Sequence, residues 1–378
     1  MLEKVKLHNF KSHQDTELNF DNSRLHALVG QNSSGKTSVL QALHYLSRLV
    51  NSSFENIFQH ERAPQFITTI GQDNMSVTAS GYSGDNPRAD WEASYNWQQQ
   101  KVNPPWFPIA SWKVGRAAGN LQGWSHSLGA APYRLPKSLR HSVHLKLVAT
   151  NLSKAAYSDA ITPRIKFDGS GLAPTLDYLR EEAPEQFQYL EEMLQKIVPG
   201  VQKLGVRRAK VIVNRQRLIE VGGKSIPYEE SQEMTGQEVV LDMNTGKRIP
   251  AHAISEGTML ALGLLTVLMN PNQPNLVLLD DVEQGLHPKA QRELIAVFKE
   301  ILQDNPNLQI IFSTHSPYIV DELIPSQVHV LSNNNSGVTR CKRLDEHPDV
   351  EWAKQTLTTG EFWDAEGEDW VVAGEIND

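Results

Sequence analysis

The feature that most constrains this chain is the glycine-rich octapeptide Gly30-Gln31-Asn32-Ser33-Ser34-Gly35-Lys36-Thr37. The segment Leu25 to Val29, directly before it, has the short apolar character of a buried strand. After it, leucine and valine recur at helical spacing: Val39, Leu40, Leu43, Leu46 and Leu49. A strand, a glycine-rich turn and a helix in this order predict an α/β fold.

The octapeptide matches the Walker A pattern in full, and it lies in the strand–loop–helix context that the pattern requires. Its glycines let backbone N–H groups turn towards phosphates, and the helix N-terminus adds a partial positive charge. We expect Lys36 to reach the β- and γ-phosphates and the Thr37 hydroxyl to bind Mg²⁺. The residues expected to bind the nucleotide here are Gly30, Asn32, Ser33, Ser34, Gly35, Lys36, Thr37 and Ser38. The sequence therefore predicts ATP and Mg²⁺ as ligands, against the alternative of a glycine-rich turn that happens to precede a lysine.

A second apolar run, Leu276 to Leu279, ends in the two carboxylates Asp280 and Asp281. A buried strand would deliver them to the carboxyl edge of the sheet, where ligands bind in open α/β folds. Asp280 is predicted to hold Mg²⁺ opposite Thr37, and Asp281 to polarise the attacking water. The competing interpretation is a strand followed by an acidic turn.

A third apolar run, Gln309 to Phe312, is followed by Ser313-Thr314-His315-Ser316-Pro317. His315 is predicted to emerge at the same sheet edge as Asp280, where an imidazole could contact the γ-phosphate or the attacking water. A lone histidine is more often structural, but this one follows a strand beside two acidic positions. We therefore expect Lys36, Asp281 and His315 to be the catalytic residues.

The tetrapeptide Ser255-Glu256-Gly257-Thr258 opens a strongly apolar helix that includes Met259 to Met269. Ser255 can cap this helix, and Gly257 permits a close backbone approach, so the helix end could receive an anion. The alternative is that Ser255 is an N-cap and nothing more.

As a set, these motifs resemble the ABC-type ATPase heads of the SMC, RecF and OLD-like group, and especially the short bacterial AAA family ATPases related to OLD nucleases. The opening Leu7-His8-Asn9-Phe10-Lys11-Ser12-His13 is similar to that group's first hairpin, where Lys11 or a neighbour approaches the phosphates. Ser255 to Thr258 resembles the signature motif, Asp280 to Pro288 the Walker B motif and D-loop, and Ser313 to Pro317 the switch-histidine motif.

This resemblance implies that a second copy of the chain is a partner. In such heads two subunits enclose two ATP molecules, and the signature residues of one subunit meet the γ-phosphate held by the other. Ser255 and Gly257 would then bind the nucleotide of the neighbouring copy. Hydrolysis would separate the heads, so that ATP acts as a clamp.

Two departures from the family pattern matter. The usual glutamate after the Walker B aspartate is Asp281 here, one methylene shorter, so hydrolysis is expected to be slow or dependent on a partner. OLD nucleases carry a Toprim nuclease domain after the switch histidine, whereas only about 60 residues follow His315. We therefore expect an effector such as a nuclease to act in trans, as in the families common in phage-defence operons. The alternatives are a RecF-like ATPase that itself clamps DNA, and an ATP-bound scaffold without hydrolysis.

Composition narrows the setting of the protein. The formal charge of −8 argues against coating nucleic acid by bulk electrostatics, although a local basic patch leaves a nucleic-acid partner open. The single cysteine, Cys341, excludes an intramolecular disulfide and favours a reducing cytoplasm. No apolar run approaches the roughly 18 residues needed to span a membrane, so we expect a cytoplasmic protein without a membrane partner.

The chain alternates between strands and helices at both ends and changes character in the middle. We predict an ABC-type ATPase head of α/β class whose core is formed by residues 1–50 and 250–330. Residues 51–249 would form an inserted strand-rich and helical lobe, with a helical pattern from Leu172 to Ile197, and residues 331–378 a C-terminal extension.

The lobe contains a tryptophan-rich stretch over residues 91–124, comprising Trp91, Trp97, Trp106, Trp112 and Trp124. Exposed aromatic rings beside basic residues could stack on single-stranded nucleic acid. Burial of these rings inside a β-lobe is the favoured interpretation. Likewise, the basic run Arg207-Arg208-x-Lys210 is expected to lie on a solvated strand edge rather than to contact DNA.

Overall fold

The protein is described by a computed structural model that covers residues 1–49, 52–58, 67–82, 89–99, 106–123, 137–221, 224–271 and 274–373. The chain divides into two compact units. The first comprises Met1–His144, Pro274–Glu283 and Phe298–Asp378, and the second Leu145–Gln273 and Gln284–Val297. The predicted division into a core, a lobe and a C-terminal extension stays a proposal.

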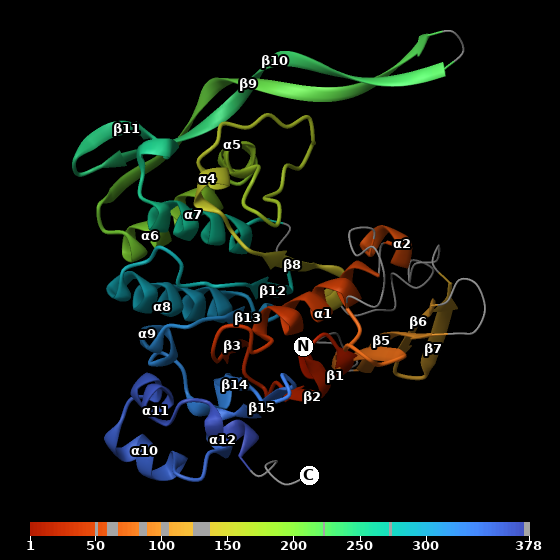
Figure 1. The fold of residues 1–378 in the computed structure, drawn as a ribbon. Coiled ribbons are helices and arrows are strands. Elements are labelled where there is room, and N and C mark those ends of the chain that lie inside the picture. Colours follow the sequence, from red (N-terminus) through yellow and green to blue (C-terminus); the bar gives the residue numbers. More distant parts are fainter. Residues whose placement is uncertain are drawn as a thin grey trace. The chain divides into compact units, whose positions relative to one another are not determined.

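The first unit contains a mostly parallel six-stranded sheet (Figure 1). Its order is β15 (Thr339–Arg343), β14 (Val328–Asn333), β3 (Leu25–Val29), β13 (Gln309–Ser313), β12 (Leu276–Leu279) and β8 (Ser142–Leu145). β14, β3, β13 and β12 run parallel, with Phe312 opposite both Ala27 and Leu279. Parallel strands are covered on both faces and therefore read as continuous apolar runs. This is why β3, β12 and β13 were predictable from the sequence.

The second sheet of this unit is antiparallel. Its order is β2 (His13–Asn19), β1 (Leu2–Phe10), β4 (Asn74–Tyr82), β5 (Asp90–Gln99), β6 (Trp106–Val114) and β7 (Ala117–Gln122). The predicted hairpin at the start of the chain is confirmed as β1 and β2. β4 alternates between buried and half-buried residues, as expected for a strand with one face on a core.

The tryptophan-rich stretch belongs to β5 and β6 of this sheet. Trp91 and Trp97 are 2% and 1% exposed, and the Trp97 indole N–H donates to Thr68 Oγ1 at 2.8 Å. Burial is therefore confirmed for these two rings. Trp112 is half-buried and lies against Gly119 on the neighbouring strand. Trp124 and the side chain of Trp106 lie outside the described residues.

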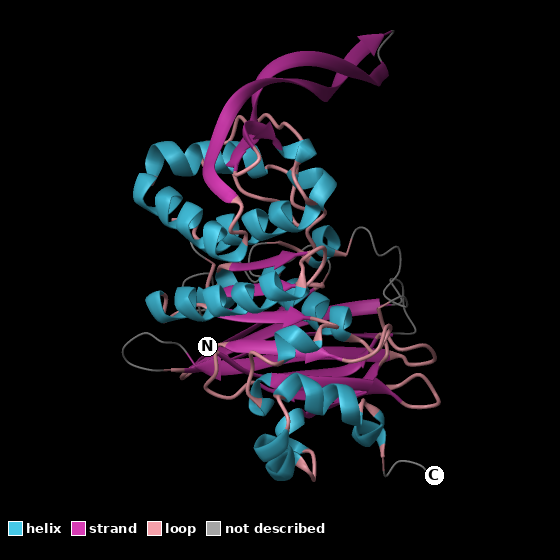
Figure 2. Cartoon of the chain, turned by 90° about the vertical axis from the view of Figure 1, so that its left-hand side faces the viewer, coloured by secondary structure: helices cyan, strands magenta, loops and turns pink. Residues whose placement is uncertain are grey.

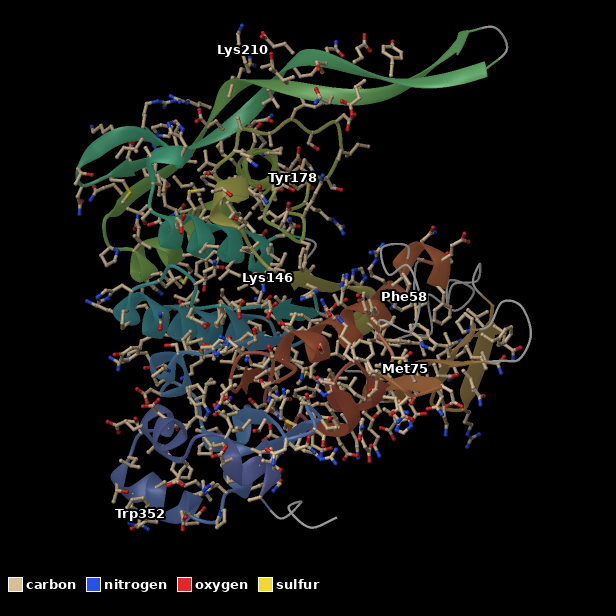
Figure 3. The ribbon with its side chains drawn as sticks, in the orientation of Figure 1. Phe58, Met75, Lys146, Tyr178, Lys210 and Trp352 are labelled. Atoms are coloured by element: carbon tan, nitrogen blue, oxygen red, sulfur yellow. The ribbon has the colours of Figure 1, made fainter. Side chains whose placement is uncertain are left out.

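Helix α1 (Lys36–Arg48) contacts strands of both sheets and is central to the core of the first unit. Its buried apolar residues are Val39, Leu40, Ala42, Leu43 and Leu46, and the fifth predicted position, Leu49, is buried directly after the helix. Phe58 and Met75 belong to the same apolar cluster (Figure 3). This packing fixes the start of α1, and with it the glycine-rich loop, against the sheet.

Shorter helices complete the first unit. They are α2 (Phe54–Ile57), α3 (Lys137–Arg140), α9 (Pro317–Val320), α10 (Val350–Thr356), α11 (Thr359–Glu366) and α12 (Asp369–Val372). α11 packs closely on α9, because a Cβ on Gly360 would lie 2.1 Å from the carbonyl oxygen of Pro317. The C-terminal helix α11 therefore packs against α9, the short helix that follows His315.

Apart from a two-stranded ribbon, the second unit is mainly helical (Figure 2). It contains α4 (Ala149–Leu152), α5 (Leu172–Glu182), α6 (Pro184–Ile197), α7 (Glu256–Leu268) and the first part of α8 (Pro288–Asp304). The helical pattern predicted from Leu172 to Ile197 is split into two helices. Pro184 has no N–H to continue the first helix and instead begins the second at its first turn. α7 is buried along its length as predicted, and none of the described helices is long and apolar enough to cross a membrane.

A long two-stranded ribbon extends beyond the helices of the second unit (Figures 1 and 2). It is formed by β9 (Val201–Val221) and β10 (Lys224–Met243), and β11 (Gly246–Pro250) pairs with the base of β10. The basic run lies on β9, where Arg207 pairs with Glu238 at 2.7 Å and Lys210 with Glu233 at 2.9 Å. Lys210 is exposed on the ribbon (Figure 3). Arg207 and Lys210 thus pair with acidic residues on β10 at a solvent-exposed strand.

Two fully buried histidines lie side by side in the parallel sheet. His26 on β3 and His329 on β14 have ring centroids 5.5 Å apart, and both meet the ring of Phe20 edge-on at 5.0 Å. Burial lowers the pKa of His26 to about 4 and that of His329 well below its usual value. Both rings are therefore neutral in the folded protein at neutral pH.

This cluster predicts how stability depends on pH. The unfolded chain takes up a proton at His26 near pH 6.5, whereas the folded chain does so only near pH 4. The contribution of neutral His26 to the free energy of unfolding is therefore fully present above pH 6.5. It falls by about 3 kcal/mol as the pH drops to about 4, because the unfolded chain takes up the proton first. We expect His26→Phe to remove most of that pH-dependent loss, as measured by urea unfolding across this range. At neutral pH it should cost only about 1 kcal/mol, for the lost hydrogen bond to the Ser23 carbonyl.

The matched control is His8→Gln, which changes an exposed histidine of β1 in the same unit. It should leave the pH dependence unchanged. Equal pH slopes for wild type and His26→Phe would contradict the assignment of a neutral buried ring.

Candidate functional site

The glycine-rich loop joins β3 to α1 and has a backbone that side chains rarely tolerate. The φ angles of Gly30, Ser33 and Gly35 are +139°, +67° and +97°. A Cβ on Gly30 would lie 2.1 Å from the Leu331 carbonyl oxygen, and one on Gly35 would lie 2.7 Å from His13 Nε2. Glycine is therefore required at both positions for conformation and for space.

Two hairpins support this loop. The Asn333 side-chain amide, at the end of β14, donates to the Ser33 carbonyl at 2.9 Å. His13, at the start of β2, places Nε2 3.2 Å from the Gly35 carbonyl. Burial lowers the pKa of His13 to about 4, so a neutral ring lies under the loop. Asn333 is a residue that the sequence analysis missed, while His13 was quoted only as part of the opening motif.

Lys36, the first residue of α1, folds back over the loop. Its ammonium donates to the carbonyls of Gly30 and Gln31, each at 2.8 Å, and the side chain is 6% exposed. Burial lowers its pKa, and the carboxylates of Asp281, Asp280 and Glu283 oppose this shift. The cation therefore lies in the field of the acidic residues that follow β12.

Asp280 connects three segments of the first unit. Its two carboxylate oxygens each lie 3.0 Å from Thr37 Oγ1, which donates to them, and Oδ1 also accepts from Ser313 Oγ at 2.7 Å. The carboxylate is buried, with 6% of the residue exposed. A carboxylate beside a hydroxyl is a donor set that suits Mg²⁺, which prefers oxygen ligands and binds through few protein groups together with phosphates. Thr37 and Asp280 thus fit the metal predicted for them.

Asp281 and His315 come from neighbouring strands and are linked through Ser313. The backbone of Asp281 has a φ of +54°, and its N–H donates to Ser313 Oγ at 2.8 Å. The imidazole of His315 is exposed, and its backbone N–H donates to Glu283 Oε1 at 2.9 Å. The structure therefore brings together Lys36, Thr37, Asp280, Asp281 and His315. Ser313 and Glu283 are additional residues of this site that the sequence analysis did not single out.

The remaining predicted residues of the loop differ in exposure. Asn32 and Ser33 are exposed, Ser34 is buried behind the loop, and Ser38 is half-buried in the first turn of α1. Lys11 has a φ of +53°, and its ammonium donates to Gln41 Oε1 on α1 at 2.6 Å. Lys11 is thus directed along α1, while His13 of the same hairpin contacts the loop itself.

The predicted signature residues lie in the second unit. Ser255 is the N-cap of α7, and its hydroxyl accepts from the Thr258 N–H at 3.4 Å. A Cβ on Gly257 would lie 2.3 Å from the carbonyl oxygen of Gly285, so the start of α7 touches the loop after Gln284. This contact explains a glycine in the first turn of an apolar helix without any anion. Ser255, Gly257 and Gly285 line a hollow of about 320 Å³.

Comparison with protein families gives one match that covers most of the chain. Residues 25–321 match the family described as "AAA domain, putative AbiEii toxin, Type IV TA system". The chain belongs to this family. The matched range includes the glycine-rich loop, Asp280 and His315.

Individual proteins agree with this family assignment. The "Retron Vc95 probable ATPase" of Vibrio cholerae is 25% identical over 136 residues, which are 32% of this chain and 26% of that protein. The "OLD nuclease" of Thermus scotoductus is 23% identical over 350 residues, 85% of this chain and 60% of that protein. The aligned residues thus span less than two thirds of either relative.

Solved structures confirm the predicted fold class. An SMC head, solved bound to the C-winged helix domain of ScpA, superposes with a TM-score of 0.51 at 16% identity, covering 90% of this chain and 96% of that one. At this identity the likeness concerns the fold alone. The AAA-domain protein thus has the fold of an ABC-type ATPase head, as the sequence motifs predicted.

A second cluster of ionisable groups lies near the C-terminal helices of this AAA-domain protein. His347, Asp349 and Glu366 place ligand atoms within 4.8 Å of one another. However, His347 Nδ1 already accepts from the Asp349 N–H at 3.1 Å, and Nε2 lies 3.5 Å from Glu366 Oε2. These contacts account for the cluster as a link within the first unit.

The close contact between Gly257 on α7 and the loop after Gln284 can be tested by substitution. In Gly257→Ala the new methyl group meets a backbone carbonyl at 2.3 Å, so the backbone must move. We expect a loss of about 1–3 kcal/mol in the free energy of unfolding, despite the better helix propensity of alanine. Gly200→Ala is the control, since its nearest neighbour would be the Met243 methyl group at 3.5 Å. Equal stability of the two variants in urea unfolding would contradict the close approach.

Proposed function

We propose that this protein binds and hydrolyses Mg²⁺–ATP, that two copies enclose the nucleotide, and that the cycle switches an effector protein in phage defence. The observation that carries the proposal is the cluster of Thr37, Asp280 and Ser313 beside the glycine-rich loop. Thr37 lies in the first helix and Asp280 directly after β12, 243 residues later, yet the two side chains share a 3.0 Å hydrogen bond. A buried carboxylate placed against the hydroxyl of a phosphate loop is what a nucleotide-bound metal requires.

The chemistry assigned to the chain's residues follows from this placement. Backbone N–H groups of the loop and of the first turn of α1 bind the phosphates, with Lys36 supplying positive charge. Mg²⁺, when bound, neutralises charge on the phosphate oxygens. Asp281 orients the attacking water and accepts its proton, and the exposed imidazole of His315 stabilises charge on the γ-phosphate.

The proposal of a shared site rests on the resemblance to ABC-type heads, in which signature residues act on the neighbour's nucleotide. Ser255 is already oriented as the N-cap of a 13-residue helix, and its hydroxyl bonds to that of Thr258 at 2.7 Å. In this account Ser255 and Gly257 of one copy approach the γ-phosphate held by Lys36 of the other.

This arrangement is tested by mixing two inactive variants and measuring phosphate release. Lys36→Ala removes the phosphate lysine, and Ser255→Arg blocks the signature position. Each should abolish turnover alone. When mixed equally, half of the dimers are heterodimers with one intact shared site out of two, so about a quarter of wild-type activity should return.

The outcomes separate the parts of the proposal. No recovery on mixing would contradict a shared site. Full activity of Lys36→Ala would contradict hydrolysis at this loop, and a wild type without turnover would leave only a nucleotide-dependent scaffold. Lys210→Ala, which changes an exposed residue of the ribbon outside the proposed site, is the control and should retain wild-type turnover.

The proposal of an effector in phage defence is supported by the relation to a retron ATPase and an OLD nuclease. It is tested by affinity purification of the tagged chain from its native host, followed by mass spectrometry. We expect a second protein to be recovered with wild type and lost with Lys36→Ala. Recovery of the tagged chain alone, with ATP present throughout, would contradict the effector.

A further inference from the structure

Glu283 is a half-buried residue beside the nucleotide site, and the proposed mechanism gives its carboxylate no role. It lies three residues after Asp280, and one of its oxygens, Oε1, accepts the backbone N–H of His315 at 2.9 Å. The other oxygen, Oε2, is buried and has no hydrogen-bond partner among the described residues. Its charge acts on Lys36, so it belongs to the electrostatic environment of the site.

We propose that Glu283 is a positioning residue that acts through His315. This inference rests on the ATPase activity proposed above, because it gives Glu283 a part in the same reaction. The imidazole of His315 is exposed, so its direction depends on the backbone from which it projects. The hydrogen bond from the His315 N–H to Glu283 Oε1 holds that backbone through an acceptor oxygen at the right reach. Glu283 therefore fixes the position from which His315 reaches the γ-phosphate.

A general base must present an oxygen to the attacking water. In Glu283, Oε1 already accepts the His315 N–H and Oε2 is buried. This geometry favours a positioning role for Glu283 and leaves the proposed role of base with Asp281.

The turn around Glu283 shows why a fixed backbone matters at this point. Val282 N–H donates to the Ser313 carbonyl at 3.2 Å, and Asp281 N–H to Ser313 Oγ at 2.8 Å. Together with the bond from the His315 N–H to Glu283, the successive residues Asp281, Val282 and Glu283 make three hydrogen bonds. These bonds join the turn after β12 to the end of β13 and to His315. A shift of one segment therefore moves Asp281 and His315 together.

Three variants separate positioning from base catalysis in steady-state ATP hydrolysis by the full chain. Glu283→Gln keeps an acceptor oxygen of the same reach and loses the charge, whereas Glu283→Asp keeps the charge and loses the reach. Glu283→Ala loses both. Positioning predicts that Gln retains kcat within about threefold, while Asp and Ala lose about tenfold or more, with KM for ATP changing less than about threefold. The reverse order, with Asp more active than Gln, would overturn the proposal.

A double-mutant cycle tests whether Glu283 acts through the imidazole. In a His315→Ala background, Glu283→Ala should cause little further loss of kcat, because the group that it positions is already gone. Independent, multiplicative losses would show that Glu283 acts on something else and would contradict the proposal.

Hydrogen exchange at the His315 amide tests the contact without any turnover. Wild type and Glu283→Gln should protect this amide, and Glu283→Asp and Glu283→Ala should exchange it at least about tenfold faster. Equal exchange in wild type and Glu283→Ala would overturn the inference even if ATP is hydrolysed. A wild type that protects this amide but releases no phosphate would instead contradict the proposed ATPase, so the two failures are distinguishable.

Discussion

The buried carboxylate of Asp280 is the constraint on which the rest of the site depends. Removing a carboxylate from water is costly unless donors surround it. Thr37 and Ser313 supply those donors, from the helix after β3 and from the end of β13. They can do so only because β3, β13 and β12 are consecutive in one parallel sheet, with their carboxyl ends at one edge. The register of this sheet therefore places the phosphate loop beside both acidic residues and His315.

The loop itself is supported by two hairpins, one near the start of the sequence and one towards its end. His13 of the first hairpin and Asn333 of the last one reach the carbonyls of Gly35 and Ser33. Both carbonyls belong to residues with left-handed backbone, which costs free energy at a non-glycine residue such as Ser33. The bond from Asn333 offsets that cost. The residues predicted as a C-terminal extension thus contribute directly to the shape of the phosphate loop.

Local patterns explain what the sequence could predict. The loop, the strands β3, β12 and β13 and the start of α7 each depend on consecutive residues, so their spacing alone was informative. The support from Asn333 spans 300 residues, and the bonds of Ser313 and Glu283 span about 32, so they depend on strand register. The order of β4 to β7 was equally hidden, because alternation shows which face is buried but not which strand is adjacent. Pro184 was a signal available in the sequence, and it divides α5 from α6.

The central claim is that Lys36, Thr37 and Asp280 form a site for Mg²⁺–ATP. The most direct test is calorimetric titration of the wild-type chain with ATP, with Mg²⁺ and with a chelator in its place. The account predicts one ATP per chain, binding that weakens without the metal, and no metal dependence after Asp280→Asn, a change at the carboxylate bonded to Thr37. A folded wild-type chain that binds no ATP in either condition, or binds it equally well in both, would contradict the account.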